Sequence, residues 1–483
     1  MRVIGIDAGT TSVSGVLLNT ETGEVEKTLS RDHEAAMDSP SPEEDLQSPE
    51  RILQVVLGIK AALNREATAR RAPKPSRGPA VGALSLTGQV HGILYIDRDA
   101  NALSPLYTWQ DGRGRRAGPK EGASWTRWAA EQTGYRVPSG YGFLTHVING
   151  SEGTVPREAT AFATILSYLT MQLAGTKKPQ VEPSDAHPLG LFQHRLGEFD
   201  SVALRKLGVE EAMVPEIVPS GTLIGHTSEG SAVYAAAGDN QAGFIGSVLD
   251  PRSTILMSVG TSGQLTVYLE GLDQLADAEG RPAETGWLNE LELRPFPGDG
   301  HLLSGASLSS GSAYSLLAKL FREVCTRYGG RDPGPLFEEM NRVDRDLLDD
   351  ERKLSVKTQF FGTRRDPSIC GSISGIGKDN LSPDYLVEGF LRGIAEELTQ
   401  FLSGVPEEIR NRRTQVVGIG NGVRRNPLFR RIASDLLARP LMVPSLAEEA
   451  ALGAAIVAAV GAGAYESYTS PERPIRYEAQ DNK

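Results

Sequence analysis

Apolar and polar residues alternate in three short runs near the start of the chain, a pattern that predicts β-strands. The runs are Val3–Asp7, Ser12–Leu18 and Glu24–Leu29. Turn residues separate them, so a β-meander is expected. A helix is expected next, because Ser48 and Pro49 suit its N-cap and first position. Its apolar stripe, at helical spacing, is Ile52, Val55, Val56, Ile59 and Leu63.

Further along the chain, the same patterns predict an alternation of strands and helices. The expected strands are Val81–Leu86, Thr254–Val259, Gln264–Tyr268 and Gln415–Ile419. The expected helices are Pro156–Leu173, Gly311–Tyr328 and Asp384–Leu402, and a helix, a short strand and a helix then reach Ala464. This alternation indicates an α/β architecture in which helices cover sheets.

Two segments in different halves of the chain share one design. "VIGIDAGTTSVSGVLL" from Val3 and "TILMSVGTSGQLTVY" from Thr254 both read as strand, Gly-Thr turn and second strand. The likeness suggests a duplicated domain with two phosphate-binding hairpins that face each other, as in two actin-like (ribonuclease H-like) domains with a catalytic cleft between them. A chain of 483 residues is longer than the size at which a single hydrophobic core stops growing, so two domains are expected. We place the domains at residues 1–231 and 232–483.

Charge and cysteine content narrow the possible partners and compartment. The 50 Lys and Arg against 61 Asp and Glu give a net charge of −11, which disfavours nucleic acid and anionic membranes. Only two cysteines are present, and the start of the chain does not resemble a signal peptide, so a cytoplasmic location is expected. The apolar stretch Ala450–Ala464 is too short to span a membrane and predicts a packed helix.

The first Gly-Thr turn, in "GIDAGTTS", has the chemistry of a phosphate site. Gly9 allows the backbone to approach a phosphate, Thr10 and Thr11 offer donors, and Asp7 can hold hydrated magnesium. Such a turn is also common as a plain hairpin. The second copy, Gly260–Thr261–Ser262, favours the phosphate-binding interpretation.

A separate turn, "AAGDNQAG", offers a candidate catalytic base. Asp239 stands between glycines after an apolar run, where a carboxylate can project into a cleft and take a proton from a substrate hydroxyl. The alternative is an Asx turn in which Asp239 or Asn240 caps the next helix.

With these residues in view, the chain resembles the FGGY carbohydrate kinases over nearly its whole length. The resemblance rests on motifs in the family's order: "GIDAGTTS", "LTGQVHGILYID", "TWQDGR", "SDA", "GDNQAG", "MSVGTSG", "ASLSSGSAY", "FGTRRDP", "GIGNGVRRNPLFRRIASDLLARP" and "EEAALGAAIVAA". It implies ATP and Mg²⁺ as cofactors, Asp239 as the base and Asp7, with Asp239, as the magnesium-linked pair. It also implies nucleotide contacts at Gly9, Thr10, Thr11, Gly260, Thr261, Gly305, Gly311, Gly420, Asn421, Gly422 and Asn426.

The resemblance also implies a sugar site in the first domain. The expected contacts are Gln89, His91, Trp109, Asp111, Arg113 and Asp185. His91 could equally be a structural histidine, Trp109 a core residue and Asp185 part of an Asx turn. "TWQDGR" is most similar to sedoheptulokinases, with xylulokinases next. Thr363 replaces a Glu that is customary in the family, and the loop after Asp185 is short, so the pocket departs from the usual pattern.

The expected activity is transfer of the ATP γ-phosphate to a primary hydroxyl of a ketose, with sedoheptulose going to sedoheptulose 7-phosphate. Xylulose or another sugar or polyol is the alternative substrate. An actin-like ATPase or a sugar-binding protein without phosphoryl transfer is the alternative of another class. The expected partner is a small-molecule sugar, with no nucleic acid and no membrane, and the chain is expected to be a monomer or homodimer.

Overall fold

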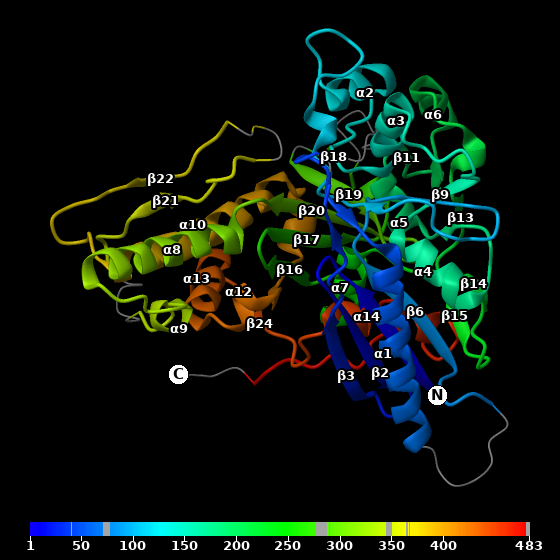
Figure 1. The fold of residues 1–483 in the computed structure, drawn as a ribbon. Helices are drawn as coiled ribbons and strands as arrows, with labels where there is room; N and C mark the ends of the chain where they lie inside the picture. The colour runs from blue at the N-terminus through cyan, green and yellow to red at the C-terminus, as the bar shows by residue number, and fades with distance from the viewer. Residues whose placement is uncertain are drawn as a thin grey trace.

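The computed structural model of this protein has two lobes, each built on one large sheet (Figure 1). It describes residues 1–39, 41–70, 78–275, 287–288, 290–343, 350–363, 366 and 368–479. Among these residues, no helix has both the length and the apolar character needed to cross a membrane.

The first lobe contains a six-stranded sheet in the order β14-β15-β6-β1-β2-β3. Its strands are β1 (Arg2–Ala8), β2 (Ser12–Asn19), β3 (Glu24–Asp32), β6 (Ala83–Gly88), β14 (Leu223–His226) and β15 (Ala232–Tyr234). The first three strands are antiparallel, whereas β6 runs parallel to β1 and β15 parallel to β6. The predicted meander is therefore confirmed.

The second lobe contains a seven-stranded sheet in the order β18-β19-β20-β17-β16-β23-β24. Its strands are β16 (Thr254–Val259), β17 (Gly263–Leu269), β18 (Trp287–Leu288), β19 (Leu291–Pro295), β20 (His301–Ser307), β23 (Gln415–Ile419) and β24 (Leu441–Met442). The run β20-β17-β16-β23-β24 repeats the order and directions of β3-β2-β1-β6-β15. The two lobes therefore share one topology, that of the actin-like architecture.

Helices and small sheets complete the lobes. The helices are α1 (Pro49–Ala69), α2 (Trp125–Thr133), α3 (Gly142–Glu152), α4 (Ile165–Ala174), α5 (Pro183–Ala186), α6 (Ser201–Leu207), α7 (Asp239–Ser247), α8 (Ser310–Gly329), α9 (Phe337–Met340), α10 (Pro383–Gln400), α11 (Glu407–Asn411), α12 (Asn421–Arg424), α13 (Pro427–Leu437) and α14 (Glu449–Gly461). The short strands are β4 (Ala36–Met37), β5 (Leu46–Gln47), β7 (Leu94–Ile96), β8 (Leu106–Tyr107), β9 (Ala161–Ala163), β10 (Gln180–Val181), β11 (Phe192–Gln193), β12 (Glu198–Phe199), β13 (Glu216–Ile217), β21 (Ser355–Lys357) and β22 (Ser372–Ser374).

The predicted helix Pro156–Leu173 is wrong in its first half. Helix α4 begins only at Ile165, because Thr164 has extended backbone and its side chain accepts a hydrogen bond from the amide of Ser167. The three residues before it, β9, pair with β7. The Ala-rich run thus belongs to a strand and a cap, which tertiary pairing selects over helix propensity.

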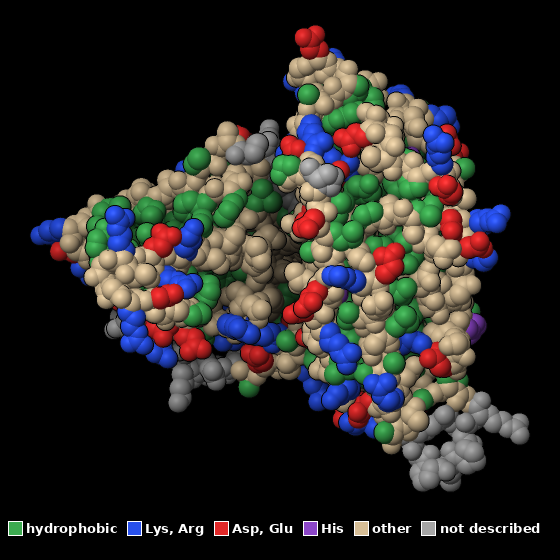
Figure 2. Space-filling view, in the orientation of Figure 1, with side chains coloured by type: hydrophobic (Ala, Val, Ile, Leu, Met, Phe, Trp, Pro, Cys, Tyr) green, Lys and Arg blue, Asp and Glu red, His purple; other side chains and the backbone are tan. Residues whose placement is uncertain are grey.

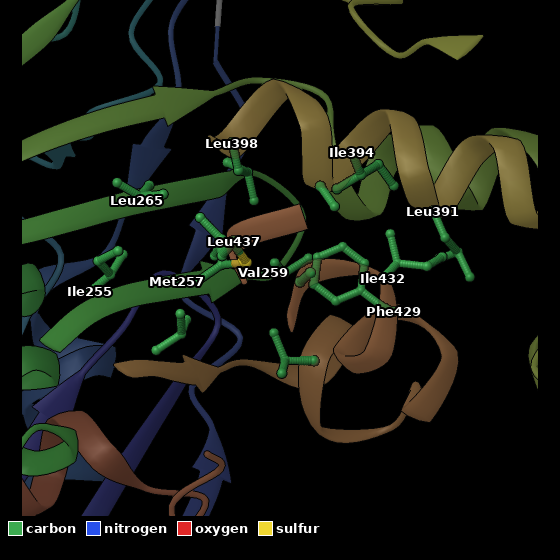
Figure 3. Close-up of a cluster of buried hydrophobic side chains, with 14 of the residues drawn as sticks. Ile255, Met257, Val259, Leu265, Leu391, Ile394, Leu398, Phe429, Ile432 and Leu437 are labelled. Atoms are coloured by element: carbon green, nitrogen blue, oxygen red, sulfur yellow. The ribbon is translucent and has the colours of Figure 1, made fainter. Parts of the chain in front are cut away.

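The core of the second lobe lies between its sheet and helices α10 and α13. Ile255, Met257 and Leu265 project from the strands towards these helices (Figure 3). The helices contribute Leu391, Ile394, Leu398, Phe429, Ile432 and Leu437. All nine side chains are buried, so apolar packing holds α10 and α13 against the sheet of the second lobe.

Helices α7 and α14 lie between the two large sheets and join them (Figure 1). The helices approach so closely that a Cβ atom at Gly246 would lie 1.9 Å from the Glu449 carbonyl oxygen. Helix α14 also lies on the first sheet, where a Cβ at Gly5 would come within 2.0 Å of the Ala451 carbonyl oxygen. The Ala- and Gly-rich run that predicted a packed helix therefore supplies the contact between the lobes.

The boundary between residues 231 and 232 stays a prediction. The strand that begins there, β15, pairs with β6 of the first sheet, and its C-terminal end leads into α7. The polypeptide chain therefore crosses from the first lobe to the second through α7.

Two glycines of α7 give a direct test of this close packing. A Cβ at Gly243 would have its nearest neighbour 4.0 Å away, in contrast to the overlap at Gly246. We expect Gly246→Ala to lower the free energy of unfolding by about 1–3 kcal/mol or more, since backbone must move. Gly243→Ala should leave it unchanged or raise it by up to about 1 kcal/mol through helix propensity. Urea unfolding of both variants measures this, and equal stabilities would contradict the close packing.

Candidate functional site

The first Gly-Thr turn connects β1 to β2 and is held by polar side chains. The side-chain Nε2 of Gln47 donates to the Thr10 carbonyl oxygen over 2.9 Å, and Nε2 of Gln89 donates to Gln47 Oε1 over 2.8 Å. The indole of Trp109 donates to Thr10 Oγ1 over 3.1 Å. Two predicted sugar residues, Gln89 and Trp109, are therefore brought to the predicted phosphate turn.

The second Gly-Thr turn connects β16 to β17 and carries the start of α8. The amide of Gly311 donates to the Gly260 carbonyl oxygen and that of Ser312 to the Thr261 carbonyl oxygen, both over 3.0 Å. A Cβ at Gly311 would lie 2.2 Å from that Gly260 oxygen. The segment at Gly420 approaches equally closely, since a Cβ there would lie 2.5 Å from the Val259 carbonyl oxygen. Three predicted nucleotide segments therefore meet at one place.

Two other predicted nucleotide residues make packing or capping contacts within the chain. Gly305 lies against Phe401, whose ring carbon would be 2.2 Å from an added Cβ. Asn426 is buried and caps α13 by accepting from the amide of Phe429 over 3.0 Å, while it donates to Asn341 over 2.9 Å. Their geometry favours structural roles over the predicted contact with a nucleotide. Asn421 is exposed at the start of α12, and Gly422 follows it.

Asp239, the predicted base, is the first residue of α7. Its Oδ1 accepts the backbone amide of the adjacent Asn240 over 2.6 Å. The N-cap of α7 is Gly238 and no side chain caps the helix, so the alternative in which Asp239 or Asn240 caps it is wrong. The preceding amide, of Gly238, donates to Ser184 Oγ over 2.9 Å in the first lobe, and Asn240 donates to Gln264 over 2.8 Å in the second. Both lobes therefore hold this segment, and the Asp239 side chain itself is open to solvent.

Electrostatics link Asp7 with Asp239. Burial, together with the negative charges of Asp239 and Glu448, raises the pKa of Asp7 to about 7. Asp239 is reached by solvent, but the surrounding protein still reduces its solvation and raises its pKa, an effect that the charge of Arg294 opposes. Two carboxylates whose environment disfavours their charge are typical of a functional site.

Asp185, in α5, is almost fully enclosed, with 1% of its surface exposed. Thr164 Oγ1 donates to its Oδ2 over 2.7 Å, while its Oδ1 has no hydrogen-bond partner among the described residues. Burial raises the pKa of this carboxyl to about 7. An unpartnered buried oxygen of this kind suits a ligand hydroxyl.

The predicted sugar residues Asp111 and Arg113 form a buried ion pair at 2.7 Å, and no surface of Arg113 is exposed. The guanidinium is also paired with Glu44 and Glu152 at 3.1 and 2.9 Å. This geometry favours a structural role over the predicted sugar contact. His91 lies beside Pro188 and Tyr141. Its Nδ1 is 3.0 Å from the Pro188 carbonyl oxygen, and its ring centroid is 4.5 Å from that of Tyr141.

Four site residues were missed by the sequence interpretation. Glu448, at the N-cap of α14, is a third carboxylate whose charge acts on Asp7. Tyr141 donates to Glu292 over 2.7 Å, and Glu292 pairs with Arg294 at 2.6 Å. The "LELRP" segment carries a signal for the last two, because charged residues alternate with leucines in a strand that is wholly buried.

Two lobes of one topology, two Gly-Thr turns and a carboxylate pair define a class, the two-domain phosphotransferases of actin-like fold. Residues 2–256 match the N-terminal domain of the FGGY family of carbohydrate kinases, and residues 353–462 match its C-terminal domain. The chain belongs to this family and is an ATP-dependent sugar or polyol kinase.

Relatives with several substrates resemble the chain about equally. It is 24% identical to human sedoheptulokinase, over 94% of this chain and 96% of the relative. It is 27% identical to glycerol kinase of Thermus brockianus, over 96% and 90%, and 24% identical to xylulose kinase of Bacillus subtilis, over 96% and 89%.

Solved structures agree on the fold. Xylulose kinase from Rhodospirillum rubrum superposes with a TM-score of 0.78 at 20% identity, covering 99% of this chain and 93% of that one. Glycerol kinase from Plasmodium falciparum with ADP gives 0.76 at 15% identity, with coverage of 99% and 93%.

The raised pKa of Asp185 predicts a pH effect on stability. Since its folded-state pKa of about 7 exceeds the usual 3.8, the folded protein binds more protons than the unfolded chain between these values. The contribution of this group to stability therefore falls as the pH rises through that window. Asp185→Asn does not titrate there, so the variant should gain stability relative to the wild type from pH 5 to pH 8. Urea unfolding at both pH values tests this, and a constant difference would contradict it.

Proposed function

We propose that this kinase phosphorylates a primary hydroxyl of a ketose, with sedoheptulose as the first candidate and Asp239 as the base. The observation that carries the proposal is the position of Asp239, which begins α7 between segments of both lobes. A group held from both sides is placed where sugar and nucleotide would meet when the cleft closes. Figure 2 shows the notch between the lobes.

In this mechanism, Asp239 accepts the proton of the attacking hydroxyl as its oxygen bonds to the γ-phosphorus in line. The bond from that phosphorus to the bridging oxygen breaks on the opposite side, and ADP is the leaving group. The transition state is loose, so alignment and charge neutralisation matter more than a strong base. The backbone amides and hydroxyls of the two Gly-Thr turns would donate hydrogen bonds to the phosphate oxygens.

Asp7 and Asp239 also fit a magnesium ion. Each carboxylate is destabilised by loss of solvation, and the charge of Asp239 adds to this at Asp7, so a cation beside them would lower the energy of both charged forms. The described residues contain no group of three or more His, Cys, Asp or Glu side chains that could hold a metal. A magnesium ion commonly keeps several of its waters, and one held beside these carboxylates would neutralise charge on the phosphates.

The sugar is inferred from two kinds of support. The "TWQDGR" segment is similar to that of sedoheptulokinases, and the human and mouse sedoheptulokinases resemble the chain over 94% of its length. Xylulose is the second candidate, because a xylulose kinase is equally identical at 24%. A non-transferring ATPase would not need the polar set of Gln89, Asp185 and Asp239.

Removing the base should separate binding from transfer. Asp239→Asn keeps the size of the side chain but cannot accept the proton, so kcat should fall by about 10²–10⁴-fold with ATP affinity retained. Coupled ADP-release kinetics and calorimetric titration with ATP measure the two quantities. Near-normal turnover would remove Asp239 from this role.

A panel of substrates decides the sugar. The panel consists of sedoheptulose, xylulose, ribulose, fructose and glycerol, each supplied with ATP and magnesium. We expect ADP release to be fastest with sedoheptulose. Preference for xylulose would keep the mechanism and correct the pocket. ATPase activity indifferent to every sugar would overturn the transfer proposal.

A further inference from the structure

Three buried polar side chains form a bridge between the lobes, which we call the Tyr141 bridge (Tyr141, Glu292 and Arg294). The hydroxyl of Tyr141 donates to Glu292 Oε1 over 2.7 Å. Arg294 donates to Glu292 Oε2 from Nε over 2.9 Å and from Nη2 over 2.6 Å. The exposed fractions are 6%, 2% and 9% for Tyr141, Glu292 and Arg294, so the bridge is largely removed from water.

The bridge connects elements that belong to different lobes. Tyr141 is the N-cap residue of α3, in the first half of the chain. Glu292 and Arg294 lie on β19, in the sheet of the second lobe. A change in the separation of the lobes would therefore stretch the Tyr141–Glu292 hydrogen bond.

Each end of the bridge lies beside a residue or segment with a proposed catalytic or binding role. At one end, the Tyr141 ring lies on the ring of His91, with centroids 4.5 Å apart. At the other end, the carbonyl oxygen of Pro295, next to Arg294, accepts from the Gln241 side chain over 2.7 Å. Gln241 is two residues after Asp239 in α7. The bridge thus extends from the expected sugar loop to the segment that carries the base.

A buried ion pair is a poor device for stability alone. Desolvation of both charges offsets much of their attraction, and apolar residues of similar size are often equally stable there. The pair at Glu292 lies among leucines of the same strand, where such residues would fit the pattern. Two hydrogen bonds from Arg294 and one from the Tyr141 hydroxyl fix the orientation of Glu292. These bonds are better explained by a need to hold the three side chains in one arrangement.

We propose that Arg294 is a positioning residue for Asp239, and that the Tyr141–Glu292 hydrogen bond makes this positioning depend on contact between the lobes at the sugar loop. This inference rests on the proposed function. The base would be aligned when the first lobe is in place against β19 and less well aligned when it is not, which favours transfer to a bound sugar over transfer to water.

Tyr141→Phe is the sharpest variant, because it deletes one hydroxyl and keeps the ring that lies on His91. We expect kcat for the sugar to fall by about 10- to 100-fold with the KM for ATP unchanged, as for a small misplacement of a reacting group. Arg294→Lys should retain more activity than Arg294→Gln, because it keeps the charge.

Matched controls exist in the second lobe. Tyr385 donates to Asp350 over 2.6 Å, and Arg392 pairs with buried Glu388 at 2.6 Å. Tyr385→Phe and Arg392→Lys remove comparable contacts away from the bridge and should leave kcat near the wild-type value. Thermal unfolding of all variants separates a loss of fold from a loss of alignment.

Amide hydrogen exchange supplies a readout that needs no activity. Exchange at Asn240 and Gln241 should be faster in Tyr141→Phe than in the wild type and unchanged in Tyr385→Phe, because only the first variant loosens β19 from the other lobe. Wild-type kcat and wild-type exchange in Tyr141→Phe would overturn the inference. If exchange is faster in Tyr141→Phe but the wild-type protein phosphorylates no sugar, the bridge is retained and the proposed function is refuted.

Discussion

The close approach of α7 and α14 is the constraint on which the site depends. These helices can lie between the sheets only because Gly246 and Gly453 present no side chain, where an added Cβ would meet backbone oxygens at 1.9 Å. The first residue of α7 is Asp239, and the N-cap of α14 is Glu448. The same packing that joins the lobes therefore places two carboxylates near Asp7, with no dedicated scaffold for each.

The site is built against the electrostatic preference of its own groups. Asp185 is enclosed and Asp7 is half-buried, and loss of solvation is the main cause that raises the pKa of each to about 7. Enclosure of a carboxylate costs free energy unless a partner compensates it. Ligands that bring a cation or hydroxyl donors would supply that compensation, which explains why an acidic protein can bind a polyphosphate nucleotide. The buried pair of Asp111 and Arg113 shows the other solution, in which the compensation comes from within the chain.

Much of the fold could be predicted from the sequence, because strand and turn patterns are local. The two hairpins with Gly-Thr turns lie at the predicted positions. The bounds of α8 and α10 differ from the predicted bounds by one or two residues at each end. The first half of the helix expected at Pro156 failed, since the pairing of β9 with β7 is a distant contact that no local pattern shows. The packing of Gly305 against Phe401, the helix cap made by Asn426 and the ion pair of Arg113 could not be predicted for the same reason. Whether a polar or small residue faces a ligand or the core depends on what folds against it.

We propose that the two lobes bring ATP and a sugar hydroxyl together at Asp239. Phosphorus NMR of a reaction mixture with ATP, magnesium, sedoheptulose and the wild-type protein distinguishes this transfer from hydrolysis. We expect a phosphomonoester resonance that grows in step with ADP and is absent when the sugar is omitted. Inorganic phosphate as the sole new product, formed at the same rate with and without sugar, would refute the proposal.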